Sequence, residues 1–164
     1  MKSLFIIRHA KSAWGSFDLP DFDRPLNDRG KKDAPEMARR LLNKNVKIDF
    51  FVSSPAKRAR KTCQAFCEVF NYPKENILLI DELYHAPKEI FYEVVKSLEN
   101  QYNSVAIFSH NPGITHFVNS LIDNFQIDNM PTCGVFAVSS SCQIWETFFE
   151  NSINMISFDA PKIN

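Results

Sequence analysis

Four side chains that can bind and transfer a phosphoryl group lie just beyond apolar runs of this sequence. Arg8 and His9 directly follow the first run, Arg58 lies shortly after the second, and His110 follows a later one. Two guanidinium groups suit a tetrahedral oxyanion, because each presents several donors in a planar fork. A neutral imidazole nitrogen can attack phosphorus, and the remaining cationic groups can stabilise charge on the transferring group. The residue types therefore predict a phosphoryl-transfer site.

The elements that must position these residues follow from the hydrophobic pattern. Short apolar runs typical of buried strands alternate with stretches of helical periodicity. The expected strands are 4–7, 48–52, 77–80 and 105–108, with two late strands at 135–138 and 144–149. The expected helices run from 28 to about 43, from 55 onward, over 87–100, and up to about 125, and residues 14–27 are expected to form a surface loop.

This alternation predicts an α/β protein, a three-layer α/β/α sandwich around a mostly parallel central sheet. Ligands of such sheets bind outside the carboxyl ends of the strands, where the two arginines and two histidines are expected to converge. Ser54 as N-cap and Pro55 as the first helical residue would add backbone N–H groups beside Arg58.

Composition limits the class of protein. The chain has 164 residues, is 45% hydrophobic, and its 19 basic residues balance 19 acidic ones. No repeat or linker interrupts it, so we expect a single domain over 1–164. The balanced charge argues against a nucleic-acid binder, and the basic run 57–61 is expected to be a solvated helix face. No apolar stretch has the length of a signal or membrane span, and the four cysteines form no C-x-x-C pair, so we expect a cytoplasmic protein with no membrane partner.

Several motifs in order resemble the histidine phosphatase superfamily, which has the phosphoglycerate mutase-like fold. The likeness is greatest to its SixA-like phosphohistidine phosphatase branch, in which alanine often replaces the superfamily's usual glycine after the histidine. The matching segments are Arg8-His9-Ala10, Asp23-Arg24-Pro25-Leu26-Asn27-x-x-Gly30, Ser53-Ser54-Pro55-x-x-Arg58-Ala59, Leu83-Tyr84 and Ser109-His110-x-Pro112.

The resemblance implies a role for each matching residue. His9 would be the phosphorylated nucleophile, and the phosphate pocket would be completed by Arg8, Arg58 and His110. Ser12 stands where the family often has a hydroxyl group near the phosphate. Glu82 lies near the position of the acidic proton donor of mutase and phosphatase relatives. No metal or cofactor is implied.

The expected activity is that of a metal-independent phosphatase acting through a phosphohistidine intermediate, with phosphohistidine in proteins as its substrate. Two alternatives stay open. One is a small-molecule phosphomonoesterase or phosphomutase on the same scaffold, acting on a small phosphorylated substrate. The other is a phosphate-binding regulatory module without turnover.

Overall fold

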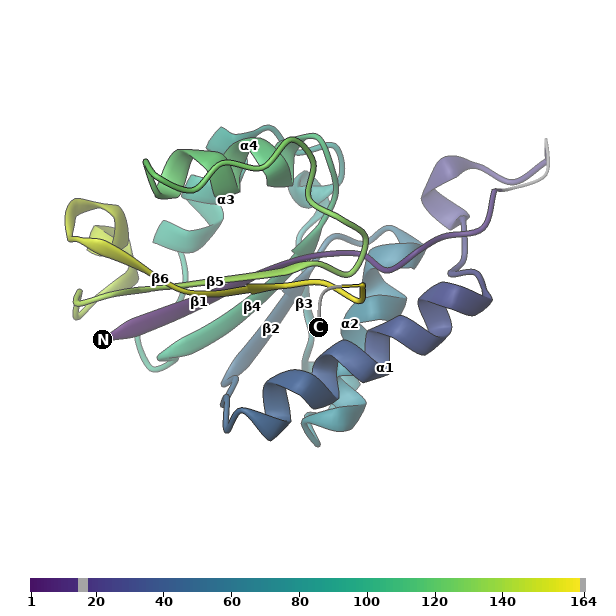
Figure 1. The fold of residues 1–164 in the computed structure, drawn as a ribbon, viewed down its shortest axis with the longest axis horizontal. Helices are drawn as coiled ribbons and strands as arrows, with labels where there is room; N and C mark the ends of the chain where they lie inside the picture. The colour runs from purple at the N-terminus through teal and green to yellow at the C-terminus, as the bar shows by residue number, and fades with distance from the viewer. Residues whose placement is uncertain (15–17, 163–164) are drawn as a thin grey trace.

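A six-stranded mixed sheet forms the centre of the computed structural model, which describes residues 1–14 and 18–162 (Figure 1). The strand order is β3-β2-β4-β1-β5-β6, with β3, β2, β4 and β1 parallel and with β5 and β6 antiparallel to their neighbours. The strands are β1 (Lys2–Arg8), β2 (Phe50–Ser53), β3 (Leu78–Leu79), β4 (Ser104–Ser109), β5 (Val135–Ser140) and β6 (Ile153–Asp159).

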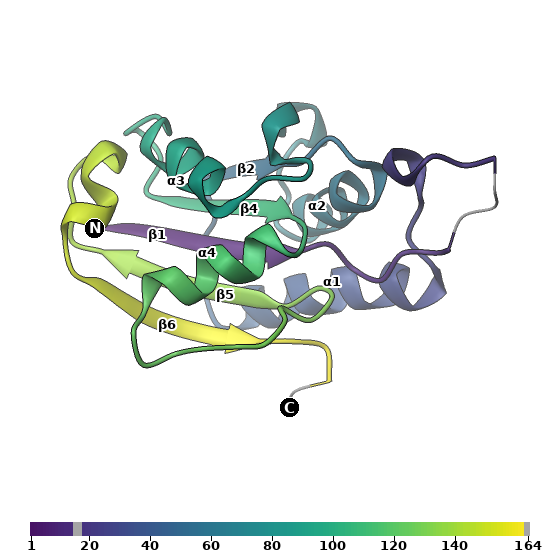
Figure 2. The same ribbon diagram turned by 90° about the horizontal axis from the view of Figure 1, so that it is seen from above.

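Helices cover both faces of the sheet (Figures 1 and 2). On one face lie α1 (Asp28–Asn43) and α2 (Lys57–Val69), and on the other lie α3 (Lys88–Lys96) and α4 (Gly113–Leu121). Short 3-10 helices are η1 (Asp21–Asp23), η2 (Lys74–Asn76), η3 (Asp81–Leu83) and η4 (Trp145–Glu150). The predicted three-layer α/β/α fold with a mostly parallel sheet is therefore confirmed.

The central strand β1 is buried on both faces. Leu4 and Ile6 belong to the core under α3 and α4, whereas Phe5 and Ile7 belong to the core under α1 and α2. Alternate side chains of a strand point to opposite faces, so a continuous apolar run fills two cores at once. This double burial fixes the position of the residues that follow β1.

The carboxyl ends of β1, β2 and β4 meet at one edge of the sheet. Arg8 pairs with Ser109 in the parallel register of β1 and β4, and the His9 amide donates to the Ser109 carbonyl at 3.2 Å. The Ser54 amide, just beyond β2, donates to a carbonyl of β4 at 2.9 Å. His110 follows Ser109 directly, so the predicted convergence of strand ends holds.

Several sequence-based assignments are wrong. The helix expected over 87–100 ends at Lys96, and the helix expected to reach about residue 125 ends at Leu121. Residues 144–149 are not a strand: Trp145 and Phe148 lie in η4, where their i,i+3 spacing turns both rings into the core. The last strand is β6 instead. Helix α2 begins at Lys57 rather than at residue 55, and the Ser54 hydroxyl bonds to His110 rather than capping the helix through its second or third residue.

The predicted loop 14–27 contains residues 15–17, which lie outside the described residues. Of its described part, only η1 is helical, and Ser12 forms an isolated bridge with Leu26.

Among the described residues, no helix combines the length and the apolar character needed to cross a membrane.

The first turn of α1 contacts the loop that follows β1. Asn27 caps the helix by accepting from the Gly30 amide at 2.9 Å, and its own amide donates to the Lys11 carbonyl at 3.0 Å. A Cβ atom at Gly30 would lie 2.1 Å from that carbonyl oxygen, which is backbone and cannot rotate away. Glycine at this position therefore allows the helix to support the loop that follows the histidine.

We predict that Gly30→Ala destabilises the protein by ~1–3 kcal/mol and lowers its activity, because the added methyl displaces the Lys11 loop. Thermal unfolding followed by circular dichroism measures the loss. Lys32→Ala, at an exposed position of the same helix, is the control and should leave the melting temperature nearly unchanged. Equal stability of Gly30→Ala and wild type would contradict this close packing.

Candidate active site

A pocket of about 310 Å³ opens at the carboxyl edge of the sheet. Five residues predicted from the sequence line it: Arg8, His9, Ser12, Arg58 and His110. Five residues to which the sequence analysis gave no role in the site complete its wall: Lys11, Trp14, Arg24, Asn111 and Thr132. The pocket therefore holds four basic side chains and two imidazoles.

His9 is buried and its free nitrogen is defined by a backbone contact. Its Nδ1 lies 2.8 Å from the Ala10 carbonyl oxygen, which can only accept, so Nδ1 carries the proton and Nε2 keeps its lone pair. Burial, together with the charges of Arg8 and Arg58, lowers the pKa of His9 to about 3. The imidazole is therefore neutral at physiological pH, as a nucleophile requires.

His110 lies beside His9, with ring centroids 5.2 Å apart. Its Nε2 is 2.7 Å from the Ser54 hydroxyl, whereas its buried Nδ1 has no hydrogen-bond partner among the described residues. Burial, with the proximity of His9 and Arg58, lowers the pKa of His110 to about 2. If the Ser54 hydroxyl donates to Nε2, the unpartnered Nδ1–H is a donor for a ligand.

Arg8 is held without being neutralised. Its Nη1 donates to the Met130 carbonyl at 2.9 Å, and its buried Nε has no partner among the residues that the structure describes. A carbonyl orients a guanidinium but leaves its full charge available to an anion. Arg8 thus presents a second unsatisfied donor beside His9.

Arg58, in the first turn of α2, is held by a carboxylate that sequence reasoning missed. Its Nη1 donates to the Asp21 carbonyl at 2.8 Å and its Nη2 to the Asp21 carboxylate at 3.1 Å. The Asp21 carboxylate also accepts from the Tyr84 hydroxyl at 2.6 Å and from Arg24 at 3.0 Å. The Tyr84 hydrogen bond, with the two arginines, holds the pKa of Asp21 well below its usual range. Asp21 is therefore a fixed anion that orients Arg58.

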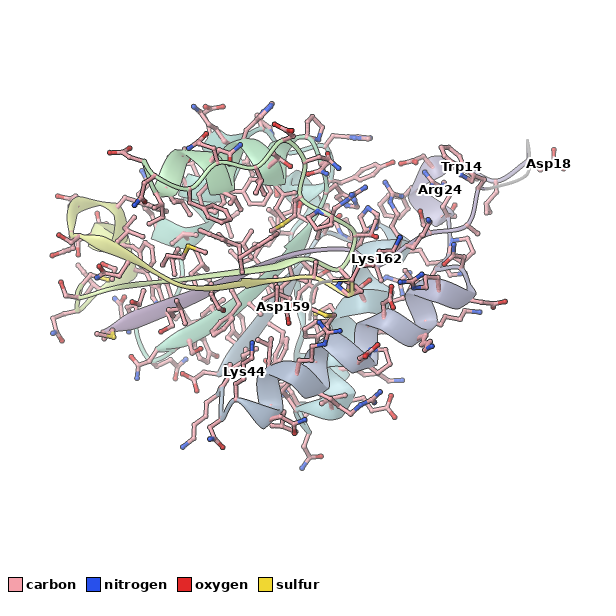
Figure 3. All side chains as sticks on the ribbon, in the orientation of Figure 1. Trp14, Asp18, Arg24, Lys44, Asp159 and Lys162 are labelled. Carbon is pink, nitrogen blue, oxygen red and sulfur yellow. The ribbon has the colours of Figure 1, made fainter. Side chains whose placement is uncertain are left out.

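Arg24 connects this network to the loop after β1. Its Nη2 donates to the Ser12 hydroxyl at 2.6 Å, its Nε donates to the Ala13 carbonyl at 3.1 Å, and its guanidinium lies 5.0 Å from the Trp14 ring centroid. Figure 3 shows Trp14 and Arg24 at the same end of the molecule. In the sequence, the one signal for a role of Arg24 was that it belongs to the motif that ends at Gly30.

Glu82 is the one predicted site residue that the structure does not bring into the pocket. It lies in η3, is exposed, and is not among the residues that line the pocket. Tyr84, two residues later, is the member of this segment that contacts the network, through Asp21.

Thr62 joins the loop after β1 to α2. Its hydroxyl donates to the Arg58 carbonyl at 2.8 Å and accepts from the Ala10 amide at 2.9 Å. One buried side chain therefore ties the backbone beside His9 to the helix turn that carries Arg58. This bond fixes the spacing between the histidine and the arginine.

Fold and pocket together define an α/β protein with a basic oxyanion site at the carboxyl ends of its strands. Residues 4–89 match the family model of the histidine phosphatase superfamily (branch 1). The chain belongs to this superfamily, which confirms the resemblance seen in the sequence.

Solved structures resemble the whole chain. A SixA structure from Agrobacterium tumefaciens shares 27% identity and a TM-score of 0.82, covering 98% of each chain. A protein histidine phosphatase SixA complexed with tungstate shares 23% identity and a TM-score of 0.81, covering 97% of each. An uncharacterised chloroplastic protein of Arabidopsis thaliana is 32% identical over 84 residues, which are 51% of this chain and 38% of that relative's length. The protein is therefore similar to SixA in its overall structure.

We predict that both pocket histidines remain neutral at pH 5, where an unperturbed imidazole is mostly protonated. Nitrogen-15 NMR of labelled histidine should show His9 as the Nδ1–H tautomer, with His9→Ala and His110→Ala assigning the signals. An imidazolium signal from His9 at pH 5 would contradict the assigned environment.

The same two histidines should make the stability of the protein depend on pH. The unfolded chain binds their protons near pH 6.5, whereas the folded chain binds them only at about pH 3 and 2. The free energy of unfolding should therefore fall as pH drops below about 6.5.

We further predict that Asp21→Ala lowers kcat/KM roughly tenfold, because Arg58 loses the carboxylate that orients it and a small misplacement of a charged group is costly. Steady-state kinetics on a small aryl phosphate measures the effect. Asp23→Ala is the matched control: this neighbour is exposed and takes part in none of these ion pairs. The positioning role fails if the two variants have the same kcat/KM.

Proposed function

We propose that this protein dephosphorylates phosphohistidine in proteins through a covalent phosphohistidine intermediate at His9. The observation that carries the proposal is the set of unsatisfied groups in one pocket. The buried Arg8 Nε and His110 Nδ1 lack partners among the described residues, and the His9 Nε2 lone pair is free. Buried donors without partners are costly, so a pocket that collects them suits an anion that accepts from all of them.

In the first step, His9 Nε2 attacks phosphorus, a P–N bond forms to His9, and the bond from phosphorus to the leaving group breaks with its electron pair. Arg8, Arg58 and His110 donate to the three phosphoryl oxygens as charge shifts during transfer. In the second step, water attacks phosphorus, the bond to His9 breaks, and inorganic phosphate leaves. Guanidinium groups supply the charge stabilisation, so the proposal needs no metal.

The proton that a leaving group needs distinguishes the possible substrates, and it favours a phosphoramidate, in which phosphorus is bonded to nitrogen. The carboxylate of Glu82, the candidate general acid, is exposed and outside the pocket lining, so it is not placed to protonate a leaving group in the pocket. An alcohol leaving group depends on proton donation in the transition state. The imidazole of phosphohistidine can instead take up a proton at its other ring nitrogen before it leaves. Because the described residues that line the pocket include no carboxylic acid, the pocket fits phosphohistidine better than a sugar phosphate.

The position of the pocket supports a macromolecular substrate. Trp14, on its wall, is 91% exposed, so the site meets the surface where a protein could present a phosphorylated side chain. Ser12 lines the same wall and would contact the phosphate or its carrier. The known SixA protein that has been solved with tungstate gives a precedent for a tetrahedral oxyanion in such a fold.

A reducing compartment such as the cytoplasm is the proposed location. All four cysteines are free and buried: Cys63, Cys67, Cys133 and Cys142. Burial raises the pKa of Cys63 well above its usual value, which keeps this thiol protonated and unreactive.

We predict that His9→Ala abolishes phosphate release, because the variant lacks the Nε2 lone pair that forms the P–N bond of the intermediate. Phosphate release from a phosphohistidine peptide measures turnover, and acid-labile label on the wild-type protein detects the intermediate. His116→Ala, an exposed histidine on α4, should retain full activity. Turnover by His9→Ala would refute the mechanism.

A substrate panel separates the alternatives. Faster turnover of sugar phosphates than of phosphohistidine peptide would favour a small-molecule phosphatase or mutase. Phosphate binding without any turnover or label would favour a regulatory module.

A further inference from the structure

A second hollow, of about 260 Å³, adjoins the catalytic pocket. Lys11 and Thr132 line both, so the two cavities share a wall. The second hollow extends away from His9 toward Arg29 on α1 and toward Lys162, beyond the end of β6. A ligand longer than a phosphoryl group can therefore occupy both cavities at once.

The hollow carries uncompensated positive charge. Lys11 and Lys162 are exposed, and neither ammonium group pairs with a carboxylate within residues 1–14 and 18–162. Arg29 directs its Nε to Asp33 at 3.1 Å and leaves its terminal nitrogens for another partner. Asp33 is buried and already paired. In a chain whose net charge is zero, this local excess of cations favours an anionic ligand.

The rest of the lining is apolar and limits the kind of anion. Pro131, Ala160 and Pro161 contribute hydrocarbon surface to the hollow. Methylene groups can pack on such a surface while a carboxylate reaches the lysines at the rim. A glutamate side chain has this combination of apolar stem and charged end, whereas an inorganic anion would use only the rim.

We propose that this hollow binds a glutamate or aspartate side chain close to the phosphorylated residue of the protein substrate. The inference rests on the proposed function, and it adds an acidic flanking residue to the substrate class. Because the catalytic pocket and the hollow share Lys11 and Thr132, the acidic side chain and the phosphoryl group would be bound together. The linked contacts would lower KM, since the second is made within one bound chain.

The test compares two charge reversals, Lys162→Glu and Lys44→Glu. Figure 3 shows Lys162 beyond β6 and Lys44 at the far end of α1, so the second variant changes the same charge away from the hollow. The substrates are two phosphohistidine peptides that differ only in glutamate or glutamine beside the phosphorylated residue, and a small aryl phosphate.

Wild type and Lys44→Glu should have a lower KM for the glutamate peptide than for the glutamine peptide. Lys162→Glu should raise the KM of the glutamate peptide roughly fivefold and remove this preference. The kcat values and turnover of the aryl phosphate should not change. An unchanged preference in Lys162→Glu, or an equal change with all three substrates, would overturn the inference.

Binding to the His9→Ala variant distinguishes this inference from the proposed function. Its affinity for the two peptides, with and without Lys162→Glu, does not depend on turnover. One outcome is that the wild type hydrolyses neither peptide, while the His9→Ala variant binds the glutamate peptide more tightly and loses this preference with Lys162→Glu. That outcome would overturn the proposed function and support the binding of an acidic side chain in the hollow. Turnover of both peptides with equal affinity would do the reverse. Tighter binding of free glutarate than of the glutamate peptide would assign the hollow to a small dicarboxylate and overturn the proposal.

Discussion

The pairing of β1 with β4 is the constraint on which the site depends. Both strands are central and buried on both faces, so neither can slip by one residue without moving its apolar side chains to the wrong core. That register places Arg8 opposite Ser109 and brings the rings of His9 and His110 to a centroid distance of 5.2 Å. The energy that holds the two imidazoles together is thus hydrophobic burial several residues away, not an attraction between the rings.

Main-chain carbonyl oxygens hold the arginine side chains of the pocket in place. Met130, Asp21 and Ala13 supply carbonyls to Arg8, Arg58 and Arg24, and these contacts fix direction without cancelling charge. One carboxylate, that of Asp21, is shared between Arg58 and Arg24. Repulsion among the guanidinium groups is therefore reduced by a single anion, and the side of the pocket with Arg8 and the histidines keeps a positive potential. Burial keeps both histidines neutral in this field, which preserves the nucleophile.

Patterns local in sequence carried the prediction of this fold, and contacts between distant segments limited it. Apolar runs located the strands, and residues at their carboxyl ends could be assigned to one edge, which is why Arg8, His9 and His110 were found. Asp21 has no such signal, since its partner Arg58 lies in another element 37 residues away. The error at residues 144–149 has a different origin: a short apolar run fits a strand or a turn of helix equally well, and only the core decides.

The order of strands also determines when the site can exist during synthesis. Strand β1 is made first but lies between β4 and β5, and the bond from Arg8 to the Met130 carbonyl spans 122 residues. A nascent chain on the ribosome therefore exposes His9 on an unpaired strand until most of its length has emerged. Pairing over such sequence separations is slow. A fragment that stops before β4 therefore contains the nucleophile His9 but lacks His110, and the catalytic pocket cannot form until β4 has been made and has paired with β1.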